Sequence, residues 1–485
     1  MEVHSFIFFS LGKDKAFSMD KSSKLSRSLG LRYVIIVVIA NIIGSGVYKK
    51  VAPMAAELES SGWVLIAWVA AGLITLMGAL CNAEVGGLLA DTGGEYAYYK
   101  KIYNRFVAFM FGWSLFTVIQ TAAIASIAYV FAQSFASIVQ LPEVFISMQE
   151  VNLAGVFYPF AGFSVKLVAI FLIILLSWIN SRGIKTGAGI SNVILLMVFL
   201  GIGTIIIFGL SNPAAELKDT FSLSSAGVKS SVNISTFFTA MLAAFWAYQG
   251  WYSIGFIGGE IKDAHRNLPK GLFIGVLIVI SVYLLVNATF LSLLTVPELN
   301  QVYENGNQIA AVEAVRVFWG DNGALFISVL ILITTLGCTN ASILTGARPY
   351  YAMAKEGMFF SSVAHLNKHH APVNSLWFQC IWASTLVVSG NFDQLTDMVI
   401  FAVFLYYGAT AAGVFILRIK MPDAIRPYKV WGYPFVPAIF ILFCAGLIFN
   451  TVITRPREAA IGFALMLTGV PMFWWFKRAA VKKNS

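Results

Sequence analysis

The sequence predicts an all-α integral membrane protein that crosses the bilayer about twelve times. Hydrophobic residues make up 58% of the 485 residues and charged residues only 12%, about half the share of an average soluble domain. The apolar residues form long blocks between short polar loops, and each block is close to the roughly 20 residues that a helix needs to cross the hydrocarbon core. None of the blocks alternates in polarity as the strands of a membrane barrel do.

The apolar blocks give the expected helices in chain order. Their expected ranges are 31–53, 62–86, 105–136, 163–181, 187–210, 234–258, 271–296, 322–348, 373–391, 395–418, 433–452 and 459–477. Residues 1–30 and 479–485 are expected to be cytoplasmic tails. The four cysteines all lie inside apolar blocks, which indicates ordinary packing residues rather than disulfide partners.

The distribution of basic residues predicts that both ends of the chain lie in the cytoplasm. With this orientation most of the 33 Lys and Arg residues fall on the inner side, as the positive-inside rule requires. The net charge of +10 is then a consequence of topology and does not indicate nucleic-acid binding. The exceptions on the outer side are Lys49, Lys50, Lys166, Lys218, Lys229, Arg316, Arg455 and Arg457.

The first expected helix contains Gly44-Ser45-Gly46 at its centre. Two glycines this close together favour local unwinding, because glycine adopts backbone angles that are closed to other residues. Unwound backbone at membrane depth persists only where it is buried in protein or lines a cavity. The freed NH groups of the second half-helix would then face an anion such as a carboxylate. The alternative is close helix packing through small residues.

A second interruption is expected in the sixth helix, where Gln249 and Gly250 interrupt an apolar run. Two interrupted helices five spans apart are typical of an inverted repeat of five plus five helices. The repeats would cover residues 31–210 and 234–418, and the two helices within 433–478 would lie outside them. This pattern predicts a secondary transporter with its substrate site between the two interruptions.

Several motifs resemble one known family, the L-amino acid transporter branch of the amino acid–polyamine–organocation superfamily, in its bacterial type. The similarity runs from about residue 30 to residue 478 and implies the LeuT-type fold. The motifs are Ile42-Ile43-Gly44-Ser45-Gly46-Val47, Ala83-Glu84, Thr92-Gly93-Gly94-Glu95-Tyr96-Ala97-Tyr98, Trp246-Ala247-Tyr248-Gln249-Gly250-Trp251, Gly259-Glu260, Asn267-Leu268-Pro269, Arg348 and Tyr351-Ala352-Met353-Ala354-Lys355-Glu356-Gly357.

The resemblance implies a substrate site made largely of backbone groups. The amides of Ser45, Gly46 and Val47, after the break at Gly44, would hold the α-carboxylate of an amino acid. Trp246 would close over the substrate from outside, and so bulky an aromatic residue favours a small substrate. The carbonyls expected to hold the α-ammonium are those of Ile42, Ile43, Trp246, Ala247 and Tyr248.

One position departs from the family pattern. Many relatives carry a lysine in the fifth helix whose ammonium resembles a bound sodium ion, and the corresponding residue here is Val198. No cofactor is expected, but a sodium ion is a candidate for this place, with the hydroxyls of Thr334, Thr335 and Thr339 as ligands, since hard cations favour oxygen. The alternative is that these threonines bond to their own helix.

Two intramembrane carboxylates, Glu84 and Glu260, lie near the cytoplasmic ends of their helices and are candidates for an inner gate. The alternative is that each is paired locally at the interface. Animal relatives pair with a glycoprotein through a cysteine in the loop after the third helix, and residues 137–162 contain no cysteine. No disulfide-linked partner is therefore expected.

The leading functional hypothesis is exchange of small neutral L-amino acids across the inner (cytoplasmic) membrane by alternating access. The alternative is sodium- or proton-coupled symport of a larger or cationic amino acid. A membrane enzyme would need a catalytic pair or metal cluster at membrane depth, and the five histidines lie outside the expected spans. A channel would need a carbonyl filter or rings of like charge, whereas the intramembrane charges are scattered.

Overall fold

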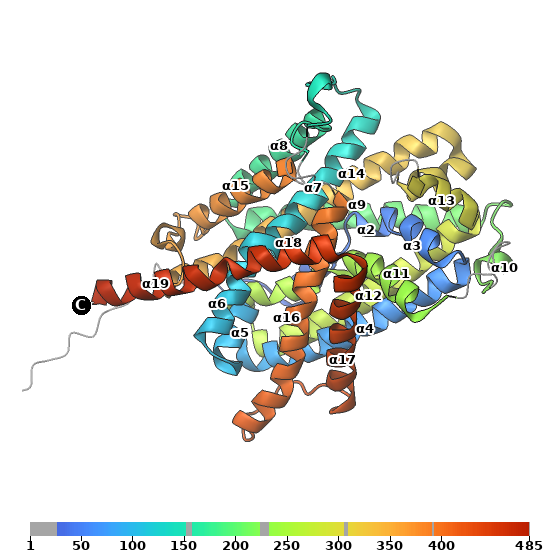
Figure 1. Ribbon diagram of the computed structural model, residues 1–485. Coiled ribbons are helices and arrows are strands. Elements are labelled where there is room, and N and C mark those ends of the chain that lie inside the picture. The colour runs from blue at the N-terminus through green and yellow to red at the C-terminus, as the bar shows by residue number, and fades with distance from the viewer. Residues whose placement is uncertain (1–26, 152–157, 224–231, 305–308, 390–391, 485) are drawn as a thin grey trace, which may run out of the picture.

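The computed structural model describes residues 27–151, 158–223, 232–304, 309–389 and 392–484. The described chain is a bundle of helices (Figure 1), and its only bridges of β type are the isolated pairs Leu29–Ile261 and Thr92–Ile257. This confirms the predicted all-α class. The expected N-terminal tail lies almost entirely outside the described residues.

The helices of the first part of the chain follow the expected blocks. They are α1 (Leu31–Ile42), α2 (Gly46–Lys49), α3 (Val51–Leu58), α4 (Ser61–Leu89), α5 (Glu95–Ile102), α6 (Arg105–Ser114), the π-helix η2 (Leu115–Ile119), α7 (Gln120–Ile138), the 3₁₀ turn η3 (Ile146–Met148), α8 (Phe163–Asn180), α9 (Ile184–Leu210) and α10 (Leu217–Thr220).

The second part of the chain begins with another interrupted helix. Its elements are α11 (Ile234–Tyr248), the 3₁₀ helices η4 (Trp251–Phe256) and η5 (Gly258–Glu260), α12 (Ala264–Leu293), α13 (Val296–Glu304), α14 (Ala310–Lys355), the 3₁₀ turn η6 (Ser361–Ala364), α15 (Val373–Ser389), α16 (Phe392–Lys420), α17 (Phe435–Thr454), α18 (Pro456–Leu467) and α19 (Gly469–Asn484).

Ten of the described helical segments are long and apolar enough to cross a membrane. Two further expected spans correspond to α11 and α15, which have 15 and 17 residues. The helix α11 is short because it ends where the second interruption begins. The protein is therefore a multi-pass membrane protein, and the count of twelve spans stays a prediction.

Several helix boundaries differ from the expected ones, and three of them illustrate why. The helix α12 begins at Ala264 rather than at 271, because its first turns are polar and carry no apolar signal. The helix α14 begins at Ala310 rather than at 322 and continues across Gly320, whose φ of 58° permits a sharp change of direction. The helix α19 runs to Asn484, so the expected C-terminal tail continues this helix.

Figure 1 shows α10 and α13 at one end of the bundle and α5 with the last residues of α19 at the other. We call these the α13 end and the α5 end. Between them, small residues bring helices into close contact. A Cβ atom at Gly271 or Gly275 of α12 would lie 2.3 Å or 2.6 Å from the side chains of Val34 and Val38, so α1 is packed directly on α12.

Candidate functional site

The first interruption separates α1 from α2 in the middle of the bundle. The helix α1 ends at Ile42, the following residue Ile43 is extended (φ −72°, ψ 101°), and α2 begins at Gly46. All of these residues are buried. The first NH groups of a helix have no acceptor within that helix, so α2 presents donors to the interior of the protein.

The second interruption follows α11. Gln249 is extended (φ −67°, ψ 151°), and Gly250 has a φ of 110°, which L-residues with side chains rarely adopt. The helix therefore ends at Tyr248, and its last carbonyls lack partners within the helix. The chain continues into η4 toward the α5 end.

The two interruptions are in direct contact. A Cβ atom at Gly46 would lie 2.5 Å from the Cα atom of Ala247, and one at Gly250 would lie 2.3 Å from the carbonyl oxygen of Asn41. Both glycines are thus required by the approach of another backbone. The structure brings together the start of α2 and the end of α11, the two groups of residues from which the sequence predicts the site.

A residue that the sequence did not indicate joins these two backbones. The hydroxyl of Tyr283, on α12, lies 3.0 Å from the carbonyl oxygen of Ile42 and 3.0 Å from that of Ala247. These are two of the carbonyls expected to hold an ammonium group. Tyr283 lies in an uninterrupted apolar helix, where no local signal distinguishes it from a packing residue.

A second unexpected neighbour is Cys338 on α14. A Cβ atom at Gly44 would lie 2.9 Å from its Sγ atom, and the thiol itself donates to the carbonyl of Asn41 at 3.5 Å. The side chain of Asn41 accepts a hydrogen bond from Thr345, which like Cys338 is on α14. The helix α14 therefore forms one wall around the first interruption.

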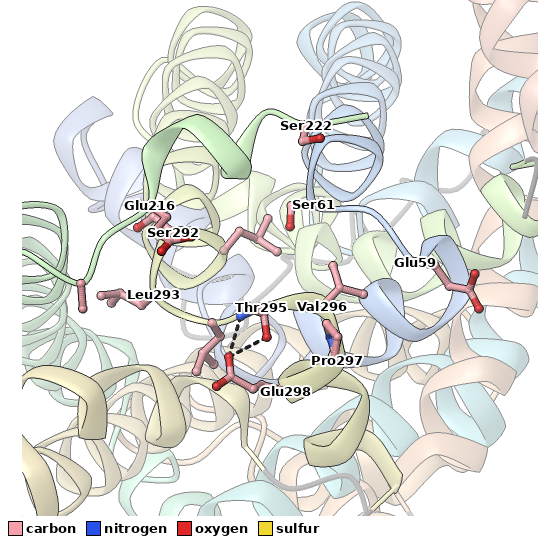
Figure 2. A pocket seen from close by; sticks show the side chains of 13 residues that line it. Glu59, Ser61, Glu216, Ser222, Ser292, Leu293, Thr295, Val296, Pro297 and Glu298 are labelled. Carbon is pink, nitrogen blue, oxygen red and sulfur yellow. Dashed lines mark hydrogen bonds between the residues drawn. The ribbon is translucent and has the colours of Figure 1, made fainter. Parts of the chain in front are cut away.

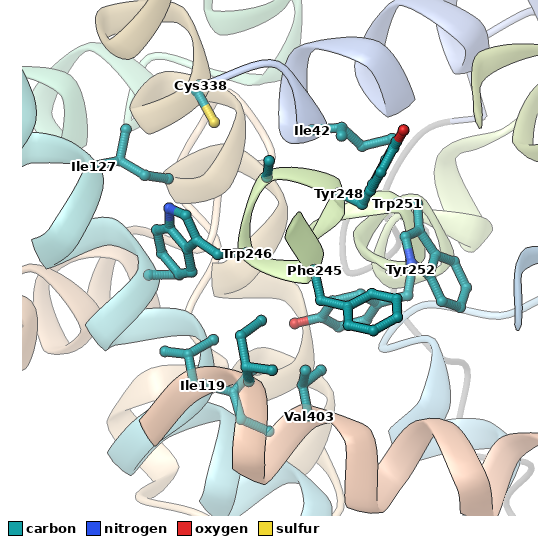
Figure 3. Packing of buried hydrophobic residues seen from close by; sticks show 14 of the residues in the cluster. Ile42, Ile119, Ile127, Phe245, Trp246, Tyr248, Trp251, Tyr252, Cys338 and Val403 are labelled. Atoms are coloured by element: carbon teal, nitrogen blue, oxygen red, sulfur yellow. The ribbon is translucent and has the colours of Figure 1, made fainter. Parts of the chain in front are cut away.

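Trp246 covers the interruptions on the side of the α13 end. Its side chain is 5% exposed and lies near Ile127 of α7 and Ile119 of η2 (Figure 3). Its ring meets that of Phe392 edge to face, with centroids 5.9 Å apart. The ammonium groups of Lys49 and Lys50 lie 4.6 Å and 4.7 Å from the centre of the Phe392 ring.

The candidate gate residue Glu260 forms a buried ion pair at the α5 end. Its Oε1 atom accepts a hydrogen bond from the Nε atom of Arg348 at 3.0 Å, and both side chains are at most 2% exposed. Its carbonyl oxygen accepts from the amides of Ser28 and Leu29. Glu260 thus connects η5, α14 and the segment that leads into α1.

The other candidate gate residue, Glu84, lies in a different cluster. Its carboxylate binds the guanidinium of Arg418 through bonds of 2.9 Å and 2.8 Å and accepts from the amide of Val430 at 2.7 Å. The Nε atom of Arg426 lies 3.5 Å away. These contacts join α4 to α16 and the segment after it, and the role of Glu84 as a gate stays a prediction.

The candidate coupling residues lie on α9 and α14, two helices that pack against each other. Val198 is buried and shares a helix face with Ile194 and Gly201, which pack on Gly337 and Leu330 of α14. The three threonines each donate to a carbonyl of their own helix, as the alternative predicts: Thr334 to Leu330, Thr335 to Ile331 and Thr339 to Thr335. Thr334 also bonds with the Tyr48 hydroxyl at 3.0 Å.

One cavity beside α13 does not belong to this site. It has a volume of about 470 Å³ and is lined by Glu59, Glu216 and Glu298 together with neutral residues (Figure 2). Glu298 accepts from the amide and hydroxyl of Thr295 and so caps α13. The lining contains none of the residues of the two interruptions.

Comparison with known proteins supplies a family context for this geometry. Residues 29–476 match the amino acid permease family. The serine/threonine exchanger SteT of Bacillus subtilis is 29% identical over 457 residues, which cover 94% of this chain and 98% of SteT.

Two mammalian proteins are also similar, and the matched region covers a smaller share of their length than it does of SteT. The human large neutral amino acids transporter small subunit 2 is 29% identical over 93% of this chain and 80% of its own. The mouse b(0,+)-type amino acid transporter 1 is 28% identical over 94% of this chain and 89% of its own.

Proposed function

The chain belongs to the amino acid permease family, and from this premise we propose that it exchanges small neutral L-amino acids across the cytoplasmic membrane by alternating access. Like its relatives, it is a membrane transporter and not an enzyme. One relative is named a serine/threonine exchanger and another a large neutral amino acids transporter. These names support a neutral substrate.

The contact between the two interruptions carries this proposal. An amino acid presents a carboxylate and an ammonium on adjacent atoms, and a site for it needs donors beside acceptors. The amides of Ser45, Gly46 and Val47 supply the donors at the start of α2. The acceptors are the carbonyls at the ends of the preceding half-helices, those of Ile42, Ile43, Trp246, Ala247 and Tyr248.

The surroundings of the site favour a small side chain. Trp246 and the apolar side chains of Ile119 and Ile127 lie on one side of the proposed site (Figure 3). Cys338 lies beside Gly44. A cavity of only about 10 Å³ lies beside Tyr248, Gln249 and Trp251, which is too small for an amino acid, and we propose that Trp246 and η4 move to admit the substrate. Alternate opening of these two elements is the movement that the proposal requires.

Ion-coupled symport is the second candidate, and Val198 is the observation that favours it. Val198 itself supplies no positive charge between α9 and α14, and in the proposed symport a bound cation would supply it. The buried hydroxyls of Thr334, Thr335 and Thr339 each keep an acceptor lone pair, since each donates only to its own helix. Oxygen ligands fit hard cations, and sodium is the one that we propose.

The proposed orientation places the α5 end in the cytoplasm and the α13 end outside. The basic residues of the loops at the α5 end support this. Because residues 137–162 contain no cysteine, we propose that the transporter works without a disulfide-linked partner.

Uptake of radiolabelled serine into proteoliposomes tests exchange against symport. We expect uptake only into vesicles preloaded with a neutral amino acid, and unchanged uptake when sodium is replaced by choline. Equal uptake into empty vesicles would contradict exchange. Loss of uptake in choline would instead support a sodium ion beside Val198.

A further inference from the structure

A carboxyl group that takes no part in the proposed substrate site is buried near the α5 end. Glu95, the first residue of α5, is 2% exposed. Its Oε1 atom accepts a hydrogen bond from the side-chain amide of Asn82 on α4, at 2.5 Å. Its Oε2 atom and the Oδ1 atom of Asn82 are buried and form no hydrogen bond with any described residue. Half of this carboxyl group therefore lacks a partner.

Apart from Asn82, the described side chains that interact with Glu95 supply hydroxyl groups and no positive charge. The titratable groups that interact with it electrostatically are Tyr98 and Tyr99 of α5, Tyr252 of η4 and Tyr407 of α16. Asp91, in the segment before α5, acts on Tyr98 as well. The hydroxyls of Tyr98 and Tyr407 are buried without a hydrogen-bond partner. Among the interactions described for Glu95 there is none with a lysine or arginine.

An ionised carboxylate is costly in such a place. Burial raises the pKa of Glu95 from its ordinary value of 4.5 to about 8, and the hydrogen bonds from its own backbone and from Asn82 reduce this shift only in part. The protonated carboxyl is therefore the form that this packing accommodates at neutral pH. Release of the proton would leave a buried charge on a carboxylate whose Oε2 atom accepts no hydrogen bond from any described residue, so entry of water would stabilise the charged form.

The segment that carries Glu95 is fixed to η4, the inner continuation of the second interrupted helix. The amide of Gly93 donates to the carbonyl of Phe256 at 2.9 Å, and Thr92 pairs with Ile257. A Cβ atom at Gly94 would lie 2.7 Å from the Phe256 ring and 2.9 Å from the backbone of Gly255. Water can reach Glu95 from this side only if these contacts separate.

We propose that Glu95 is a proton-binding site that controls the movement of η4. The neutral carboxyl keeps η4 packed against α5 and α16, and ionisation favours the hydrated arrangement in which η4 has moved away. Because η4 follows directly after the interruption at Gln249 and Gly250, proton release would promote opening of the substrate site toward the α5 end. The effect on transport rests on the proposed function, whereas proton binding at Glu95 does not.

Proton binding can be measured on the purified protein without substrate, and Glu95→Gln is the matched variant, because it keeps the shape of the neutral side chain. Infrared difference spectroscopy should show a protonated carboxyl band that is lost with a midpoint near pH 8 in the wild type and is missing in the variant. Asn82→Ala removes a donor that favours the charged form, so it should move the midpoint upward. A titration unchanged in Glu95→Gln would overturn the proposal.

The ionisation of Glu95 should also make the stability of the folded protein depend on pH. A carboxyl whose folded pKa is raised stabilises the folded state fully below its unfolded value of 4.5, and this contribution is lost as the pH rises to about 8. The melting temperature of the wild type should therefore fall over this range, and the melting temperature of Glu95→Gln should fall less. Glu313→Gln, at a half-buried residue paired with Arg316, is the control and should follow the wild type.

Transport tests the coupling to η4. Exchange in proteoliposomes should accelerate severalfold as the pH rises past the midpoint in the wild type and in Glu313→Gln, and should stay at the slow rate in Glu95→Gln. A Glu95→Gln rate that follows the wild type at every pH would exclude control by this residue. A midpoint that shifts when sodium replaces choline would show a metal cation site in place of a proton site. If no amino acid is exchanged at any pH, the infrared titration still decides whether Glu95 binds the proton.

Discussion

Position 46 requires glycine because the backbone of another helix, α11, lies against it. The backbone conformation of residue 46 itself does not require glycine. Its dihedral angles are helical, because it is the first residue of α2, so other residues could adopt this conformation. The restriction comes from Ala247, whose Cα and Cβ atoms would lie 2.5 Å and 2.6 Å from any Cβ atom added here. A methyl group is therefore already too large.

We predict that Gly46→Ala weakens binding of the substrate amino acid at least about tenfold, or about 1.4 kcal/mol, and that Gly46→Leu abolishes it. Either side chain separates α2 from α11 and so moves donors away from acceptors. Binding is measured by the substrate-induced shift in melting temperature of the purified protein. The control is Gly203→Ala in α9, where a Cβ atom meets nothing within 4 Å. Wild-type affinity in Gly46→Leu would remove α2 from the site.

Individual residues show how far the sequence predicts the site. Gly44, Gly46 and Gly250 could be identified because glycine is unfavourable in an apolar helix, and Ser45 could be identified because it lies between two of them. Tyr283 and Cys338 could not, because a tyrosine or cysteine in an apolar helix is an ordinary packing residue. Only the three-dimensional arrangement places them against the interruptions.

At the scale of secondary-structure elements, α12 holds the two interrupted helices in register. Gly271 and Gly275 pack on α1, and Tyr283 extends to the carbonyls at the ends of α1 and α11. One hydroxyl proton serves two carbonyl oxygens, so each oxygen keeps capacity to accept from an ammonium group. We interpret Tyr283 as a positioning residue for the carbonyls of Ile42 and Ala247.

We predict that Tyr283→Phe weakens substrate binding about fivefold, the equivalent of one hydrogen bond of about 1 kcal/mol. The phenyl ring fills the same volume, so the maximal rate of exchange should change less than the KM. Tyr103→Phe is the matched control, since its hydroxyl donates to the carbonyl of Ala409 at 2.7 Å, away from both interruptions. An equal change in the two variants would show a general loss of stability instead of a positioning role.

The elements themselves were predictable where an apolar pattern marks them. The blocks that became α4, α8 and α9 lie within a few residues of their expected ranges, because hydrocarbon thickness sets their length. The pattern carries no information on the π-helix η2 or on the change of direction at Gly320. These depend on packing between helices, which a single sequence does not encode locally.

For the whole molecule, the distribution of charge and the packing make different predictions. Basic residues indicate which end faces the cytoplasm, whereas packing shows only that the chain passes repeatedly between the α13 end and the α5 end. The inverted repeat over 31–210 and 234–418 stays a prediction, and the pair of interruptions remains its main support. Orientation therefore has to be measured directly.

Single introduced cysteines provide this measurement, because the four native cysteines are buried and should give little background. We predict that Gln301→Cys, at an exposed residue of α13, reacts with a membrane-impermeant maleimide in intact cells. Lys101→Cys, at an exposed residue of α5, should react only after the membrane is permeabilised. The opposite labelling would invert the orientation, and Glu95 would then lie at the outer end of the transporter, where its proton would equilibrate with the external medium.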